Sequence, residues 1–74
     1  MLDSELTISE REFIALPDGE ATRLISARFE GLCARGCDAE AAVIVAVHPE
    51  IRVDGASHLI ERGVDARTVL RLLS

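Results

Sequence analysis

Lysine, asparagine, glutamine, tryptophan and tyrosine are absent from this chain of 74 residues, and the only aromatic side chains are two phenylalanines. All eight basic residues are arginines, a pattern that a GC-rich bacterial or phage gene produces. Two cysteines cannot form a multi-bridge framework, and no signal peptide precedes them, so we expect a reducing, cytoplasmic location. The longest apolar run covers residues 41–47, far short of the roughly 20 residues that span a bilayer, and we expect no membrane partner.

Apolar residues make up 49% of the chain, which is ordinary for a globular protein and too high for a disordered one. A chain of this length has room for one domain. Its net charge of −5 is uneven, because residues 1–40 contain nine acids and four arginines, whereas residues 41–74 contain four of each. Since affinity for nucleic acid comes mainly from basic side chains, this balance disfavours a nucleic-acid partner.

Capping and stop signals divide the chain into five short helices. Ser9 and Glu12 fit a capping box for a helix over residues 10–16, which Pro17 ends. Four further helices end near Arg35, Val47, Gly63 and the C-terminus, and their expected N-caps are Asp18, Asp38, Asp54 and Asp65. The predicted fold is all-α: residues 1–74 form one compact bundle of four to five short helices, with residues 1–8 as a flexible N-terminal segment.

An N-terminal hairpin is the alternative to the first helix. Pro17-Asp18-Gly19 lies between two apolar runs and is a turn signal, so residues 13–16 could pair with residues 21–25.

Helical spacing of apolar residues predicts the core. The residues expected to face inward on the second helix are Ala21, Leu24, Ile25, Phe29, Leu32 and Cys33. The third helix is apolar all round over residues 41–47 and should form the buried centre. The inward residues of the last two helices are Val53, Ala56, Leu59 and Ile60, then Ala66, Val69, Leu70 and Leu73.

One short pattern occurs twice, because residues 35–39 (RGCDA) recur as residues 62–66 (RGVDA). Glycine after a helix end takes the left-handed conformation, an apolar residue then packs back over the helix, and aspartate caps the next helix. The repeat therefore predicts two helix–helix corners built alike.

The middle of the chain resembles a ubiquitin-associated domain. The matching positions between residues 32 and 60 are Leu32, Gly36-Cys37, Ala42, Val53, Ala56 and Leu59-Ile60. The resemblance implies a compact three-helix fold and a protein-binding face at Gly36, Cys37, Leu59 and Ile60. Arg35 replaces the usual methionine and Cys37 the usual aromatic residue, so only the fold and the binding face carry over.

Residues 6–14 (LTISEREFI) resemble the opening of a LuxR-type helix-turn-helix, and Arg28 and its neighbours fit the second helix of that family after a one-residue deletion. This resemblance implies a DNA-binding regulator that uses Arg11, Arg23 and Arg28. The following helix offers only Asp38 and Glu40 as charged groups, whereas a recognition helix needs arginine, lysine, asparagine or glutamine.

Motifs of enzymes and cofactor sites are missing from the sequence, which has no Gly-rich phosphate loop, no His-Glu-x-x-His and no Gly-x-Ser-x-Gly. Cys33, Cys37, His48 and His58 could ligate zinc, but the histidines are not spaced as the paired ligands of a structural site. We expect no catalytic residue, no metal, no cofactor and no small-molecule substrate.

The last helix carries the clearest candidate surface. Leu72 is apolar but lies off the inward stripe, and Arg67 and Arg71 stand one turn apart beside it. The predicted function is a non-enzymatic protein-binding module, of adaptor or regulatory type. It binds another protein or a second copy through this helix and the Gly36 corner. A small phage-type inhibitor, whose acidic N-terminal half occupies a partner's nucleic-acid site, is a further alternative.

Overall fold

The computed structural model describes residues 6–73, and these residues form five helices and no strand. The helices are α1 (Glu10–Ile14), α2 (Asp18–Ala34), α3 (Ala39–Ala46), α4 (Val53–Glu61) and α5 (Ala66–Leu73). The all-α prediction is confirmed. The hairpin alternative is wrong, because residues 21–25 belong to α2. Among the described residues, no helix combines the length and the hydropathy that crossing a membrane requires.

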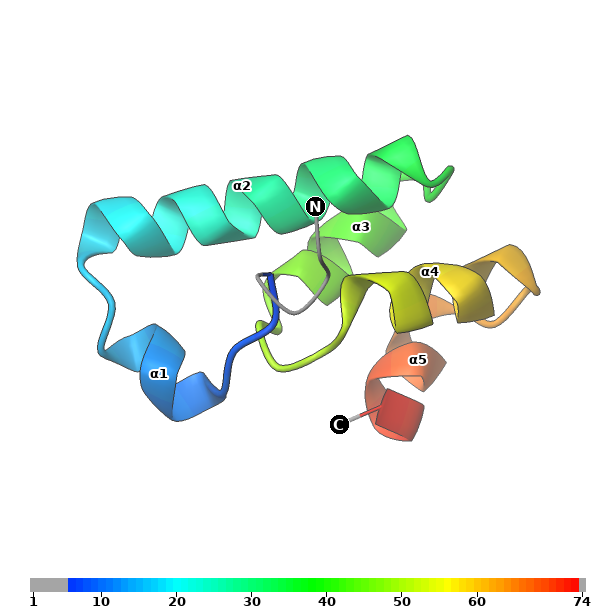
Figure 1. Cartoon of the computed structure of the whole chain (residues 1–74). Helices are drawn as coiled ribbons and strands as arrows, with labels where there is room; N and C mark the ends of the chain where they lie inside the picture. Colours follow the sequence, from blue (N-terminus) through cyan, green and yellow to red (C-terminus); the bar gives the residue numbers. More distant parts are fainter. Residues whose placement is uncertain (1–5, 74) are drawn as a thin grey trace.

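The long helix α2 lies over α3, and the chain then passes through α4 to α5 on the far side of α3 (Figure 1). The first helix, α1, stands apart and contributes no buried residue. Residues 1–5 of the expected flexible segment lie outside the described range. Residues 6–8 run against the bundle, where the Ile8 amide donates to the Pro49 carbonyl at 3.0 Å.

Three of the five expected caps are present. The Ser9 hydroxyl and the Glu12 carboxylate form a reciprocal capping box on α1, each accepting the other's backbone N–H at 3.1 Å. Asp38 and Asp65 accept the Ala41 and Thr68 amides at 2.9 and 3.2 Å. The cap predictions for Asp18 and Asp54 are wrong. Pro17 and Arg52 hold those N-cap positions, and both aspartates lie in the first helical turn.

The repeated corners share one geometry, as predicted. Gly36 and Gly63 have φ of +96° and +97°, in the left-handed region that favours glycine. The amides of Cys37 and Val64 reach back to the carbonyls of Leu32 and Leu59 at 3.1 and 3.0 Å. The Gly36 and Gly63 amides donate to the carbonyls of Cys33 and Ile60, so each corner is a Schellman motif.

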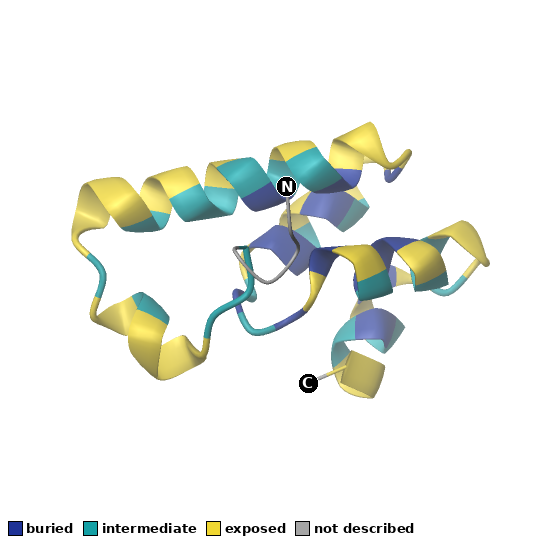
Figure 2. Ribbon diagram, in the orientation of Figure 1, coloured by how far each residue is buried: buried dark blue, intermediate teal, exposed yellow. Residues whose placement is uncertain are grey.

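The core lies between α2, α3, α4 and α5 (Figure 2). Its fully buried large apolar residues are Leu32, Val45, Ile51, Val53 and Val69. Three core predictions are wrong. Leu73, expected to face inward, is 39% exposed at the end of α5. The side chain of Cys33 is exposed, because it follows Leu32 on the outer flank of α2. The third helix is not buried all round, since Val43 and Val47 are 50% and 51% exposed.

Arg28 is the one basic residue of the described chain that is wholly buried. Its guanidinium donates hydrogen bonds of 2.6–3.3 Å to the backbone carbonyls of Leu6, Val45, Ala46, His48, Pro49 and Ile51. Carbonyls at the end of α3 lack helical partners and carry the negative end of the helix dipole, so they suit a cation. The expectation that Arg28 contacts DNA is wrong, because this side chain has no exposed surface.

Candidate interaction surfaces

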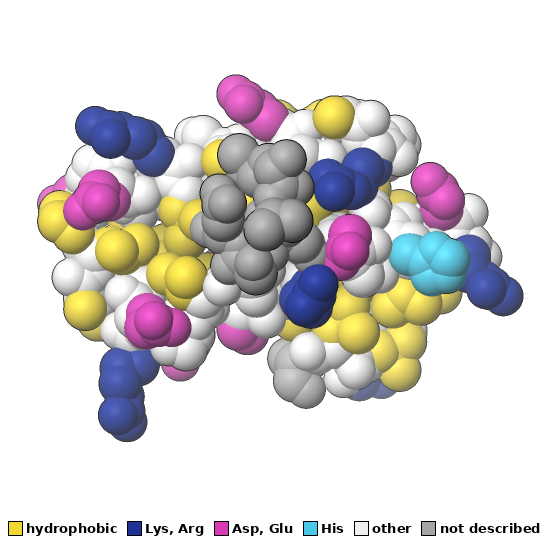
Figure 3. Space-filling model, viewed as in Figure 1, with side chains coloured by type: hydrophobic (Ala, Val, Ile, Leu, Met, Phe, Trp, Pro, Cys, Tyr) yellow, Lys and Arg dark blue, Asp and Glu magenta, His cyan; other side chains and the backbone are white. Residues whose placement is uncertain are grey.

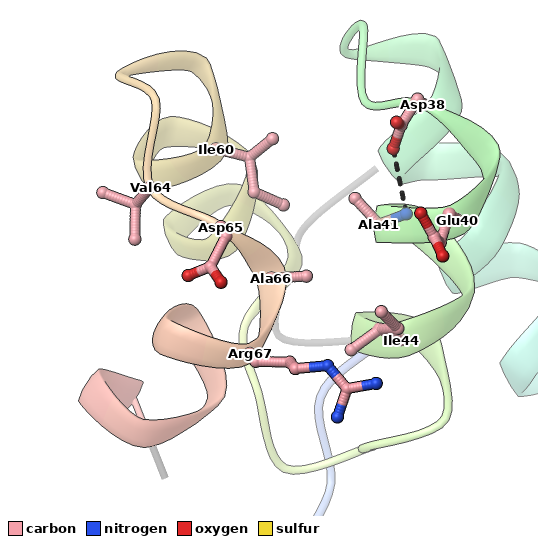
Figure 4. Close-up of a pocket in the computed structure, with 9 residues that line it drawn as sticks. All are labelled: Asp38, Glu40, Ala41, Ile44, Ile60, Val64, Asp65, Ala66 and Arg67. Carbon is pink, nitrogen blue, oxygen red and sulfur yellow. Dashed lines mark hydrogen bonds between the residues drawn. The ribbon is translucent and has the colours of Figure 1, made fainter.

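A groove of about 360 Å³ lies between α3 and the corner that joins α4 to α5 (Figure 4). We call it the α3–α5 groove. Its apolar wall includes Ile44 and Ile60, and its charged side chains are Asp38, Glu40, Asp65 and Arg67. The two aspartates cap α3 and α5, so Glu40 and Arg67 are the charged groups of this groove that hold no cap. Figure 4 shows Arg67 reaching from α5 toward Ile44.

A second groove, of about 390 Å³, lies between α2 and α3 and is mainly apolar. We call it the α2–α3 groove. Its lining residues are Ile25, Ser26, Phe29, Glu30, Val43, Ala46 and Val47. A hollow of about 270 Å³ shares Ile25 and Ser26 with it and extends the apolar surface to Phe13 of α1. Arg23 of α2 lines neither hollow.

The third surface is the end of α5, where Leu72 and Leu73 are 61% and 39% exposed. Leu73 packs over α4, since a Cβ on Gly55 would lie 3.7 Å from its Cδ1. Hydrophobic side chains gather over α4 and α5 on the face that Figure 3 shows. Arg67 and Arg71 are exposed on the same helix. We call Leu72 and Leu73 the α5 ridge.

The seven predicted partner-binding residues are divided among these places. Ile60 and Arg67 meet in the α3–α5 groove, next to Asp38 of the Gly36 corner. Leu72 and Arg71 lie exposed on α5, Leu59 is half-buried, and Gly36 is exposed at its corner. Cys37 is buried with 8% of its surface exposed, so it packs under the corner and offers a partner little contact.

The sequence does not predict the α2–α3 groove. Its apolar pattern places Val43 and Val47 in the buried centre, whereas in the structure they line this groove and are half-exposed. The signal was present in the third helix, which is apolar on every side. In so small a domain, few elements remain to cover such a helix.

The cysteines and histidines that could ligate zinc lie in different surroundings. Burial raises the pKa of the Cys37 thiol, and the neighbouring Cys33 and Asp38 raise it further. His48 contacts the Ile44 carbonyl through Nδ1 at 2.9 Å, and His58 is exposed on α4. Within residues 6–73, no three or more His, Cys, Asp or Glu side chains are grouped as ligands for a metal ion.

Comparison with models of protein families, with curated proteins and with solved structures finds no match to this chain.

Proposed function

We propose that this chain is a non-enzymatic protein-interaction module that binds another protein through the α5 ridge. The observation that carries the proposal is the exposure of Leu72, which has 61% of its surface in contact with solvent. An exposed leucine beside a second partly exposed leucine supplies the apolar centre that protein interfaces use, and Arg67 and Arg71 supply a polar rim.

The neighbouring structure supports binding at this end of the molecule. The α3–α5 groove opens beside Arg67 and adds Ile44 and Ile60 as partly buried apolar contacts. Schellman hydrogen bonds at Gly36 and Gly63 define the corners from which the chain enters α3 and α5, which favours a preorganised surface. The resemblance of residues 32–60 to a ubiquitin-associated domain also favours a protein partner.

The test compares what the tagged protein and two variants capture from a lysate of its native host. Leu72→Glu places a charge on the α5 ridge. Ile14→Glu makes the same change on α1, where Ile14 is 76% exposed and contributes nothing to the core. Both variants should retain the far-UV helicity of the wild type, because neither side chain is buried.

We expect the wild type and Ile14→Glu to retain the same stoichiometric protein, with and without nuclease, and Leu72→Glu to lose it. Equal capture by all three proteins would contradict docking through α5. Loss of the captured protein on nuclease treatment would instead indicate a nucleic-acid partner.

A further inference from the structure

The α2–α3 groove has apolar side chains at helical spacing on both of its walls. Ile25 and Phe29 stand one turn apart on α2, and Val43 of α3 stands one turn before Val47, the C-cap of that helix. Side chains at this spacing form ridges that receive the i, i+3, i+4, i+7 residues of an opposing amphipathic helix. The adjoining hollow at Phe13 lengthens the apolar surface along α2.

The charged side chain that lines this groove is acidic, and carboxylates outnumber arginines on the part of the chain that contains α2 and the start of α3. Glu30 is the only charged residue among those that line the groove, and Glu40 lies exposed one turn before Val43 on α3. Residues 6–40 expose seven carboxylates, those of Glu10, Glu12, Asp18, Glu20, Glu30, Asp38 and Glu40. Only three exposed arginines oppose them, namely Arg11, Arg23 and Arg35.

Arg28 does not offset these carboxylates at the surface, since its guanidinium lies inside the fold and has no exposed surface. An apolar groove in an acidic surface is complementary to an apolar stripe with basic flanks. We propose that the α2–α3 groove binds an amphipathic helix of another protein, whose apolar stripe is flanked by lysine or arginine. This site is separate from the α5 ridge.

The probe is a fluorescein-labelled synthetic helix of leucine and lysine, with leucine at i, i+3, i+4 and i+7, whose binding is followed by fluorescence anisotropy. One control peptide has the same composition in scrambled order, so that its leucines share no face. Another keeps the leucine pattern and replaces lysine by glutamate.

The groove variant is Val43→Ser with Val47→Ser, which removes two half-exposed apolar side chains and leaves the buried core intact. Ile14→Ser and Leu72→Ser are matched controls at exposed positions outside the groove. Glu30→Lys tests the charge at the groove itself.

We expect saturable one-to-one binding of the amphipathic lysine peptide, at least about tenfold weaker with Val43→Ser/Val47→Ser. Both control peptides should also bind at least about tenfold more weakly. Ile14→Ser and Leu72→Ser should bind as the wild type does. Glu30→Lys should weaken binding at low salt, with the difference closing as salt is raised.

Three results would overturn the proposal. If Val43→Ser/Val47→Ser binds the amphipathic peptide as tightly as the wild type does, the peptide binds elsewhere. If the scrambled peptide binds as tightly as the amphipathic one, binding depends on the net charge of the peptide and not on its apolar face. The third result comes from sedimentation equilibrium: if the wild type self-associates and the double variant does not, the groove is occupied by a second copy of the chain. Because Leu72 lies outside the groove, a negative result in this experiment does not bear on binding through the α5 ridge, which the Leu72→Glu variant tests separately.

Discussion

The Arg28 guanidinium donates through Nη2 to the carbonyl oxygen of Ile51 at 2.6 Å, across 23 residues of sequence. The same nitrogen reaches the His48 carbonyl at 2.7 Å, and Nε reaches Ala46 at 3.0 Å. One side chain of α2 therefore holds the end of α3 and the segment that leads to α4. Both Arg28 and Ile51 have no exposed surface.

Replacing Arg28 by methionine should destabilise the fold severely. The substitution leaves buried carbonyls without their donor, which costs at least about 3 kcal/mol. A domain of this size has roughly 4–11 kcal/mol of total stability, so the variant should lose at least about a quarter of it. Urea denaturation followed by far-UV circular dichroism measures the change. Arg23→Met on the exposed face of α2 is the control and should shift stability by less than about 0.5 kcal/mol. If Arg28→Met is as stable in urea as the wild type, Arg28 does not stabilise the fold through these carbonyls.

The two corner glycines should each resist substitution by alanine. At φ of +96° and +97°, a Cβ strains the backbone, and we expect Gly36→Ala and Gly63→Ala to cost about 1–2 kcal/mol each. Gly19 lies in the first turn of α2 without positive φ, and a Cβ there meets nothing within 4 Å. Gly19→Ala should therefore be neutral or stabilising by up to about 1 kcal/mol. Equal effects of the three substitutions in urea titrations would contradict the strain argument.

Asp65→Ala should lower the melting temperature near neutral pH and have less effect in acid. Hydrogen bonding by Thr68, from its side chain and its backbone amide, lowers the pKa of Asp65. An unfolded aspartate has a pKa of about 3.9, so the charged cap stabilises the fold fully above that pH. Its contribution disappears as pH falls through the lower, folded-state pKa. Thermal melts of both proteins at about pH 7 and about pH 2.5 measure this, and a difference independent of pH would be contrary evidence.

The two cysteines should react with iodoacetamide at different rates. Cys33 is exposed, whereas burial raises the pKa of Cys37 and reduces its thiolate fraction. Near neutral pH we expect Cys33 to be alkylated at least about tenfold faster, as measured by peptide mass spectrometry. Cys33→Ser should leave only slow modification, and denaturant should restore rapid reaction at Cys37. Comparable rates in the folded protein would contradict the burial of Cys37.

Features that depend on a few neighbouring residues were predictable from the sequence. The capping box of Ser9 and Glu12, the caps Asp38 and Asp65, and the corners at Gly36 and Gly63 all close within five residues or fewer. Residue types at a fixed spacing in the sequence are enough to predict such local hydrogen bonds. The number of helices and the all-α class follow from them.

The contacts of Arg28 could not be predicted by the same reasoning. Arginine is rarely buried, so its type indicated a surface contact with DNA. Its spacing of four residues from both Leu24 and Leu32 puts it on the inward stripe of α2. The carbonyls that receive it lie 17–23 residues away, and only the packed fold brings them together.

The candidate surfaces were predictable in part. The exposure of Leu72 was expected from its position off the inward stripe, and the structure confirms it. Val43 and Val47 were expected to be buried because their helix is apolar all round. Which side of α3 stays open depends on how α2, α4 and α5 pack around it, and no local pattern encodes that arrangement.

The Arg28 contacts also determine where the chain tolerates changes in length. Carbonyls of residues 45, 46, 48, 49 and 51 must all point at one guanidinium, so inserting or deleting a residue between Val47 and Arg52 would misplace them. The connection at residues 15–17 supplies no carbonyl to Arg28, and α1 contributes no buried residue. Tags, linkers and engineered insertions therefore belong between α1 and α2, and the segment before α4 should keep its length.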